Sequence, residues 1–191
     1  MMMDTGKTRI AVFSDTHGNR ASMGKMILAC GPFDYLFHLG DGVEDARAVA
    51  VDAGIPLTGI SGNEDQGSQF PRKQKVPVQG RNFLLIHGDQ FDITPYHSGE
   101  VLEGLYEKMA LMTQIEGCDI LLFGHTHKPL LAERNNIILC NPGDQYIGSP
   151  SAPTFAVITI DEAGISFRIV QEKGNGDFLE IQSLERRGSS F

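Results

Sequence analysis

Residues 9–19 read RIAVFSDTHGN, an apolar stretch that runs directly into two polar side chains, Asp15 and His17. The six residues from Arg9 to Ser14 are rich in β-branched and aromatic types, which is typical of a buried strand. Asp15 and His17 lie two positions apart, and side chains with this spacing on extended backbone point the same way. The stretch therefore predicts a strand that delivers a carboxylate and an imidazole to one place.

The same arrangement, an apolar run that ends in metal-binding residue types, recurs along the chain. DYLFHL (34–39) precedes Gly40-Asp41, IPLTGI (55–60) precedes Ser61-Gly62-Asn63, NFLLI (82–86) precedes His87-Gly88-Asp89, and DILLF (119–123) precedes Gly124-His125-Thr126-His127. In open α/β sheets, the carboxyl ends of the strands line the ligand crevice. We therefore expect one cluster, made of Asp15, His17, Asp41, Asn63, His87, His125 and His127.

These seven residues suit a divalent metal centre. Carboxylate oxygens, an amide oxygen and neutral imidazoles form a mixed nitrogen and oxygen donor set without sulfur. Each motif alone is weak, because a Gly-Asp pair is usually a turn and a histidine at a strand end is often structural. Five such motifs at five strand ends favour a metal site. Seven ligands exceed one tetrahedral site, so we predict two metals, with a mononuclear metal-binding protein as the alternative.

The expected elements indicate an α/β (α+β) fold. Strands at 9–14, 34–39 and 55–60 alternate with helices at 21–30 and 43–52, which predicts a mainly parallel sheet with crossover helices. Beyond residue 75 the short, closely spaced strands favour antiparallel pairing around a helix at 100–115; they are expected at 75–79, 82–86, 120–123, 130–133, 137–140, 154–160 and 165–170. We predict one domain over residues 1–191, with a two-layered β core flanked by helices at about 8–171 and a frayed tail from Gly174.

Composition excludes several classes of function. The chain has 191 residues, a net charge of -8 and 41% hydrophobic residues, which is ordinary for a soluble globular protein. An acidic chain is a poor partner for extended nucleic acid, which is bound through a basic surface. No apolar run approaches membrane-spanning length, so we expect no membrane association. Three cysteines without a CxxC pair indicate reduced thiols and a cytoplasmic location.

The order of the motifs resembles the calcineurin-like metallophosphoesterase superfamily. The resemblance rests on SDTHGN (14–19), GD (40–41), GNED (62–65), HGD (87–89), GHTH (124–127) and NPGD (141–144), and it covers residues 8–170. The compact length is similar to that of the small bacterial and archaeal phosphodiesterase branch. The fold implied by the resemblance is a two-sheet β-sandwich flanked by helices.

The resemblance also implies a role for each ligand. One metal would be held by Asp15, His17 and His127, the other by Asn63, His87 and His125, and Asp41 would bridge the two. The pair would be divalent ions, with manganese the first choice and iron, zinc, nickel or magnesium as alternatives. A hydroxide that bridges the two metals would attack phosphorus. Catalytic residues carried over in this way are Asp41, Asn63, His125 and Asp65.

The sequence departs from the wider family at two positions. Many members carry His directly after Gly-Asn, where this chain has Glu64, and Ser commonly follows Asn-Pro-Gly, where it has Asp144. Without the histidine, we predict a preference for esters with good leaving groups. Asn19 and His97 are candidate substrate contacts; the alternatives are a helix cap for Asn19 and an exposed loop histidine for His97. We expect His38, within a strand, to be a core residue.

The leading hypothesis is therefore a dinuclear metal-dependent phosphodiesterase that acts on a small phosphoester. A phosphomonoesterase or a nucleotide pyrophosphatase would use the same cluster. A protein-binding scaffold is the alternative from another class, because one eukaryotic retromer subunit resembles this fold and has lost a productive metal site. All seven ligand positions match here, which favours an enzyme. The sequence is also compatible with an oligomer.

Overall fold

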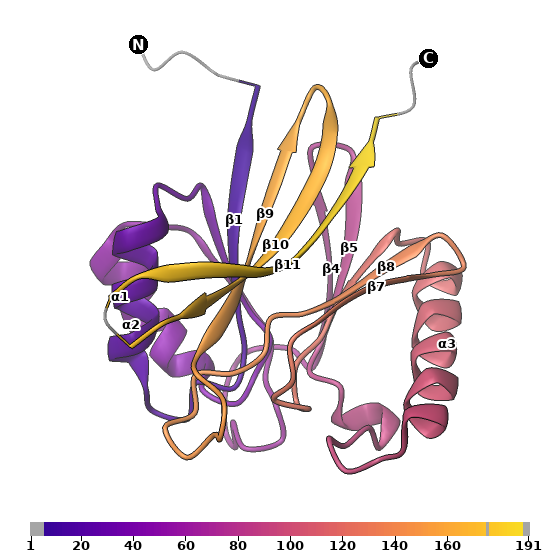
Figure 1. Ribbon diagram of the computed structural model, residues 1–191, viewed down its shortest axis with the longest axis horizontal. Coiled ribbons are helices and arrows are strands. Elements are labelled where there is room, and N and C mark those ends of the chain that lie inside the picture. The colour runs from indigo at the N-terminus through magenta and orange to yellow at the C-terminus, as the bar shows by residue number, and fades with distance from the viewer. Residues whose placement is uncertain (1–5, 175, 189–191) are drawn as a thin grey trace.

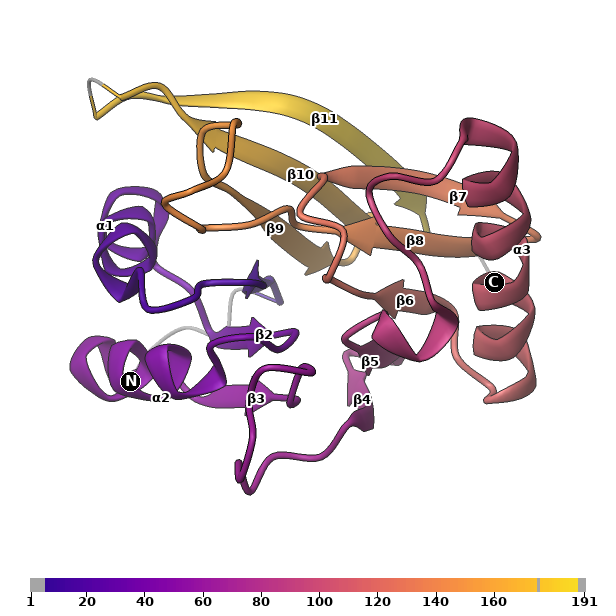
Figure 2. The ribbon, with the colours of Figure 1, turned by 90° about the horizontal axis from the view of Figure 1, so that it is seen from below.

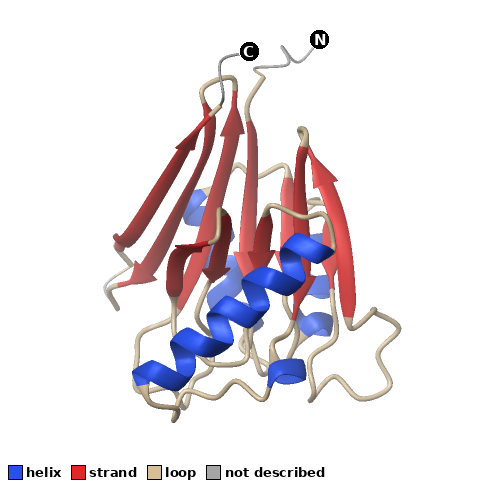
Figure 3. Ribbon diagram, turned by 90° about the vertical axis from the view of Figure 1, so that its right-hand side faces the viewer, coloured by secondary structure: helices blue, strands red, loops and turns tan. Residues whose placement is uncertain are grey.

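Two mixed β-sheets pack face to face in the computed structural model, which describes residues 6–174 and 176–188. Helices α1 (Arg20–Cys30) and α2 (Val43–Ala53) cover the outer face of one sheet, and α3 (Gly99–Ile115) covers the outer face of the other (Figure 1). Figure 3 shows α3 in front of the strands, with the other helices behind them. This arrangement confirms the predicted two-sheet core flanked by helices.

The first sheet has the strand order β11-β10-β9-β1-β2-β3. Strands β1, β2 and β3 are parallel, and α1 and α2 are the crossover helices between them, as the alternation predicts. The other pairs of this sheet are antiparallel. The bounds are Thr8–Phe13 for β1, Tyr35–His38 for β2, Leu57–Gly59 for β3, Thr154–Asp161 for β9, Gly164–Glu172 for β10 and Phe178–Arg187 for β11.

The second sheet has the order β4-β5-β6-β8-β7. Its central strands β5, β6 and β8 are parallel, so the predicted antiparallel pairing is wrong for them, although it is confirmed for the β4–β5, β7–β8 and β9–β10 hairpins. Helix α3 lies between β5 and β6 in the chain, and such a long connection joins parallel strands. The bounds are Lys73–Val78 for β4, Arg81–Ile86 for β5, Ile120–Leu122 for β6, Leu130–Arg134 for β7 and Ile137–Asn141 for β8.

The predicted frayed tail is wrong for residues 178–187, which form β11 and pair with β10. Ile181 and Leu184 of this strand pack against the core between the sheets. Because β11 is an edge strand with one face in water, most of its residues are polar, and its sequence therefore resembles a loop. Residues 189–191 of the predicted tail lie outside the described residues.

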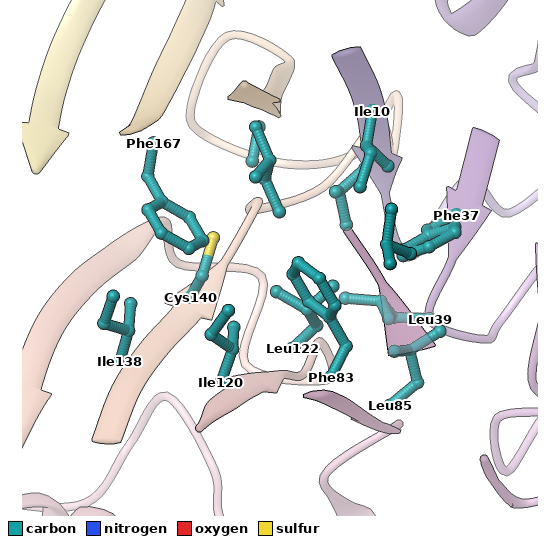
Figure 4. Close-up of a cluster of buried hydrophobic side chains, with 14 of the residues drawn as sticks. Ile10, Phe37, Leu39, Phe83, Leu85, Ile120, Leu122, Ile138, Cys140 and Phe167 are labelled. Carbon is teal, nitrogen blue, oxygen red and sulfur yellow. The ribbon is translucent and has the colours of Figure 1, made fainter. Parts of the chain in front are cut away.

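Neighbouring residues of the central strands serve different layers. In β1, Ile10 and Val12 belong to the core between the sheets, whereas Ala11 and Phe13 pack beneath α1 and α2. Burial on both faces explains why this strand reads as a continuous apolar run. Figure 4 shows the inter-sheet core, in which side chains of the two sheets meet.

The central strands of both sheets end at the same side of the molecule. The loops that follow β1, β2, β3, β5 and β6 gather at the bottom of Figure 1, the side that faces the viewer in Figure 2. The short 3-10 helix η1 (Asp89–Phe91) lies in the loop after β5. Within the described part of the chain, none of the helices is long and apolar enough to cross a membrane.

Candidate metal centre

Six of the seven predicted ligands form two groups at these strand ends. The first ligand group is Asp15, His17 and His127, and the second ligand group is Asp41, His87 and His125. Within each group, one ligand atom from every residue lies within 4.8 Å of the others. The first group has the membership implied by the resemblance. The second contains both predicted histidines together with Asp41.

In the first ligand group, the side chains of two loops face one another. Nε2 of His127 lies 3.3 Å from Oδ1 of Asp15 and 3.3 Å from Nε2 of His17. The distance between His17 Nε2 and Asp15 Oδ1 is 3.9 Å. Two residues that follow β1 therefore meet one that follows β6, across the gap between the sheets.

The second ligand group adjoins the first through the carboxylates of Asp41 and Asp15. His87 Nε2 lies 3.2 Å from Oδ2 of Asp41 and 3.2 Å from Nδ1 of His125. It is also 3.9 Å from Oδ1 of Asp15, a member of the first group. Asp41 in turn has a ligand atom within 4.8 Å of one from His17. Both carboxylates thus stand between the two groups, which suits the bridging position expected for Asp41.

The backbone at five of the ligands is held in the left-handed region, which residues other than glycine seldom adopt. The φ angles are 52° at Asp15, 42° at His17, 54° at Asp41, 66° at His125 and 56° at His127. Each such residue costs about 1–2 kcal/mol. Strain of this kind concentrates at functional sites, where surrounding structure enforces it. Its coincidence with five predicted ligands supports a function for the cluster.

The buried carboxylate of Asp15 tests whether the cluster fits a cation. Its Oδ2 accepts a 3.0 Å hydrogen bond from the backbone N–H of His125. Its Oδ1 is also buried, yet it has no hydrogen-bond partner among the described residues. An anionic oxygen buried in this state is costly. Because ring nitrogens surround that oxygen, a divalent cation would satisfy it, and the residues fit the metal.

The ionisation of the cluster agrees with this reading. Burial raises the pKa of Asp15 and Asp41, but their interactions with His127 and His87 outweigh it, so both pKa values lie below the usual range. Burial lowers the pKa of His125, assisted by His87, which favours a neutral ring. Asp144, with Asp15, raises the pKa of His127 to about 10. Without metal, a proton on His127 supplies charge that the carboxylates require, and a bound cation would displace it.

Asp65 organises the loops beneath the cluster. Its carboxylate accepts four backbone hydrogen bonds, from Asp41, Gly42, Val43 and Gly62, at 2.7–3.1 Å. Both oxygens are therefore engaged by the loops after β2 and β3. The placement contradicts the catalytic role predicted for Asp65, because its oxygens face backbone amides. It is a positioning residue.

The remaining predicted contacts lie at the edge of the cluster or away from it. Asn63 is exposed in the loop after β3. Asn19 caps α1, since its side chain accepts from Ser22 N–H, and the Nδ2 atom donates to the carbonyl of Gln145. His97 is on the loop before α3, with Nε2 2.9 Å from the carbonyl oxygen of Asp92. The structure thus supports the alternatives given for Asn19 and His97, a helix cap and a loop histidine.

Two residues beside the cluster were missed in the sequence. Asp45 accepts hydrogen bonds from the Thr16 hydroxyl and the Gly18 N–H, which holds the loop after β1. Acidic residues are common in the first turn of any helix, so the sequence carries no separate signal for it. Tyr146 packs edge-on against His17, with ring centroids 5.1 Å apart, and remains 45% exposed.

His38 is fully buried, as predicted for a core residue.

Comparison with known proteins adds an independent finding. The sequence model described as the calcineurin-like phosphoesterase superfamily domain matches residues 8–163. A probable metallophosphoesterase of Methanothermobacter thermautotrophicus is 28% identical over 167 residues, which cover 85% of this chain and 91% of that protein.

Solved structures share the fold at lower identity. A predicted phosphoesterase from Streptococcus pneumoniae has a TM-score of 0.69 and 22% identity, over 94% of this chain and 98% of that one. Vps29 of Entamoeba histolytica, solved in complex with Zn²⁺, has a TM-score of 0.71 and 19% identity, over 93% of this chain and 99% of that one. These two similarities concern the fold alone.

Proposed function

Because the chain belongs to the calcineurin-like phosphoesterase superfamily, we propose that it hydrolyses a phosphodiester bond in a small substrate, using two divalent cations. The observation that carries the proposal is the meeting of the two ligand groups around the buried, unpartnered Oδ1 of Asp15. Without a cation, residues from four separate strand ends place two buried carboxylates together, and the charge that compensates them has to come from a proton on His127.

Each part of the cluster has a task in this proposal. The first ligand group would hold one cation and the second ligand group, with Asn63, the other, while Asp41 would reach both. When bound, the cations, manganese foremost, supply Lewis acidity, which lowers the pKa of water and stabilises charge on the phosphoryl oxygens. Asp15 and Asp41 are held ionised, and His125 is held neutral, so these three need no change of protonation to act as ligands.

The charge around the cluster favours a diester over a monoester. A monoester dianion requires more positive charge than a diester monoanion. Two basic side chains near the cluster are engaged elsewhere: Arg72 pairs with Asp89, and the Lys128 ammonium donates to the carbonyl of Pro95 at 2.7 Å. The cations would therefore be the main source of positive charge for the substrate.

The side chains around the cluster offer little help to the departure of the leaving group. Glu64 stands where many relatives carry histidine, and its carboxylate lies against His17 rather than free in the loop. His97 is turned toward the carbonyl of Asp92. Neither residue offers an imidazolium to the open side of the cluster, so we expect substrates whose leaving group departs without protonation.

The test is a hydrolysis assay on metal-free protein reloaded with Mn²⁺. We expect metal-stimulated cleavage of an aryl phosphodiester, slower cleavage of the matching monoester and still slower cleavage of an alkyl diester. Asp41→Asn should lower the diester rate on the order of 100-fold or more. Glu44→Gln, which removes an exposed carboxylate on α2, is the matched control and should change nothing.

A protein-binding scaffold remains the second candidate, since the fold is shared with Vps29. The intact ligand set argues against it. The assay separates the two functions, because a scaffold would bind Mn²⁺ and cleave none of the three esters. That result would overturn the proposed hydrolysis.

A further inference from the structure

The two positions at which the sequence departs from its family converge on one ligand group. Glu64 stands in the loop after β3, and Asp144 stands in the loop after β8. The carboxylate of Glu64 lies 3.1 Å from Nδ1 of His17, and that of Asp144 lies 3.0 Å from Nδ1 of His127. Both histidines of the first ligand group therefore have a carboxylate close to the outward ring nitrogen, as a hydrogen bond between His17 and Glu64 and as an ion-pair contact between His127 and Asp144, while Nε2 faces the cluster.

Each carboxylate is anchored where it stands. The backbone N–H of Glu64 donates a 2.8 Å hydrogen bond to Oδ1 of Asp41, so the residue is tied to the second ligand group while its side chain reaches the first. The Asp144 side chain is buried, and the N–H of the next residue, Gln145, bonds to the carbonyl of Asp15. These links fix the backbone positions from which both carboxylates reach the rings that they contact.

Among the residues that the structure describes, neither histidine of the second ligand group has a carboxylate in ion-pair contact with its Nδ1 atom. Nδ1 of His87 faces the neutral carbonyl oxygen of Leu39 at 2.7 Å, and Nδ1 of His125 points into the cluster toward His87. Asp89, the acidic residue beside this group, is paired with Arg72. The two groups therefore differ in the charge behind their imidazoles.

A carboxylate that accepts the outward N–H of a metal-bound imidazole fixes its tautomer and raises its basicity; losing such a partner typically weakens metal binding 10–100-fold. Resting on the proposed function, we infer that Glu64 and Asp144 are paired positioning residues that make Asp15, His17 and His127 the tighter of the two cation sites. Glu64 then replaces the family's histidine with a residue that acts on the metal ligand His17, and no longer on the leaving group.

The inference is tested by titrating metal-free protein with Zn²⁺. Calorimetry measures the two binding steps, and proton–nitrogen correlation spectra of the histidine rings show which residues respond to each. We expect His17 and His127 to shift with the first equivalent, and His87 and His125 with the second. Glu64→Gln keeps a hydrogen-bond acceptor without the charge and should weaken the first step on the order of tenfold. Glu64→Ala should weaken it further.

Asp144→Asn should weaken the first step by a similar factor and leave the second unchanged. Glu44→Gln is the matched control, because its carboxylate is 58% exposed, close to the 63% of Glu64, and it faces no ligand. The inference is overturned if the second ligand group fills first, or if Glu64→Gln weakens both steps equally or neither.

The outcome also distinguishes this inference from the proposed function. If the wild-type protein binds two Zn²⁺ in the expected order but Mn²⁺ supports no ester hydrolysis, the proposed function fails and the inference stands. If hydrolysis depends on metal and Glu64→Gln leaves the first step unchanged, the inference alone fails.

Discussion

Oδ2 of Asp65 accepts a 2.7 Å hydrogen bond from the backbone N–H of Asp41. The same oxygen accepts the N–H of Gly62 at 2.8 Å, and the other oxygen accepts those of Gly42 and Val43. One carboxylate thus ties the loop after β2 to the loop after β3. The position of the Asp41 side chain in the second ligand group depends on this connection.

Replacing Asp65 with asparagine should therefore destabilise the protein. An amide has a single acceptor oxygen, and its NH2 group would face two of the four N–H donors. Hydrogen bonds to a charged group contribute about 1.5–3 kcal/mol each, so we expect the free energy of unfolding to fall by about 2–4 kcal/mol. Urea unfolding measures it, with Asp52→Asn on the exposed side of α2 as the control. A loss within error of that control would contradict the role of Asp65.

Gly62 permits the close approach of the two loops, and a larger residue there should disturb Asp41. A Cβ atom at Gly62 would lie 2.1 Å from Oδ1 of Asp41. We expect Gly62→Ala to weaken Mn²⁺ binding at least tenfold, because the carboxylate must move. The control is Gly104→Ala in α3, where a Cβ meets nothing within 4 Å. Equal Mn²⁺ affinities of the two variants would show that the loop adapts without cost.

The backbone at His127 is left-handed, with φ of 56°. In such a conformation glycine should give the more stable protein and alanine the less stable one, which is the reverse of their usual order. Both substitutions remove the same ring, but only alanine keeps a Cβ that clashes in this conformation. In metal-free protein, His127→Gly should exceed His127→Ala in unfolding free energy by about 1 kcal/mol. At Leu111, an exposed helical position, alanine should be the more stable. An alanine advantage at both positions would refute the assigned strain.

His38 should make the metal-free protein less stable as the solution becomes acidic. Burial lowers its pKa from 6.5 to about 4, so between these values the unfolded chain binds a proton that the folded chain does not. Stability is therefore lost as the pH falls from 6.5 toward 4, and by pH 5 the loss from His38 is about 2 kcal/mol.

Comparison with His38→Asn isolates this contribution. Asparagine keeps an acceptor for the N–H of Gly40, which bonds to Nδ1 of His38 at 3.3 Å, but does not titrate. Between pH 7 and pH 5, urea unfolding should show the wild type losing about 2 kcal/mol more than the variant. Parallel pH curves would mean that His38 has the same pKa in the folded and the unfolded chain, so that burial does not lower it.

The gathering of the side chains of the two ligand groups was predictable from a simple rule of strand geometry, whereas their role as metal ligands stays a prediction. A buried parallel strand must end where its apolar run ends, so a polar residue after that run lies at the sheet edge. Asp15, Asp41, His87 and His125 all satisfy this rule. His17 and His127 also reach the cluster, but not through the extended backbone from which their two-residue spacing was interpreted, because both residues and their partners Asp15 and His125 have left-handed backbone.

Contacts made through the backbone and across loops were not predictable in the same way. Asp65 acts on N–H groups that every residue carries, so no residue type marks its partners. Strand β11 lies at a sheet edge and has the polar composition of a tail. The parallel pairing of β5, β6 and β8 depends on the crossover formed by α3, whereas strand spacing alone resembled a series of hairpins.

Each ligand group takes residues from both sheets: Asp15 and Asp41 follow strands of the first, and His87, His125 and His127 follow strands of the second. The separation of the ligands is consequently governed by the thickness of the interior, where the Phe37 and Phe83 rings meet with centroids 6.1 Å apart. A change of side-chain volume there would alter the span between the two ligand groups without replacing any of their residues. For the cations proposed here, the fit of the ionic radius would then depend on the packed interior, through residues that lie outside the cluster.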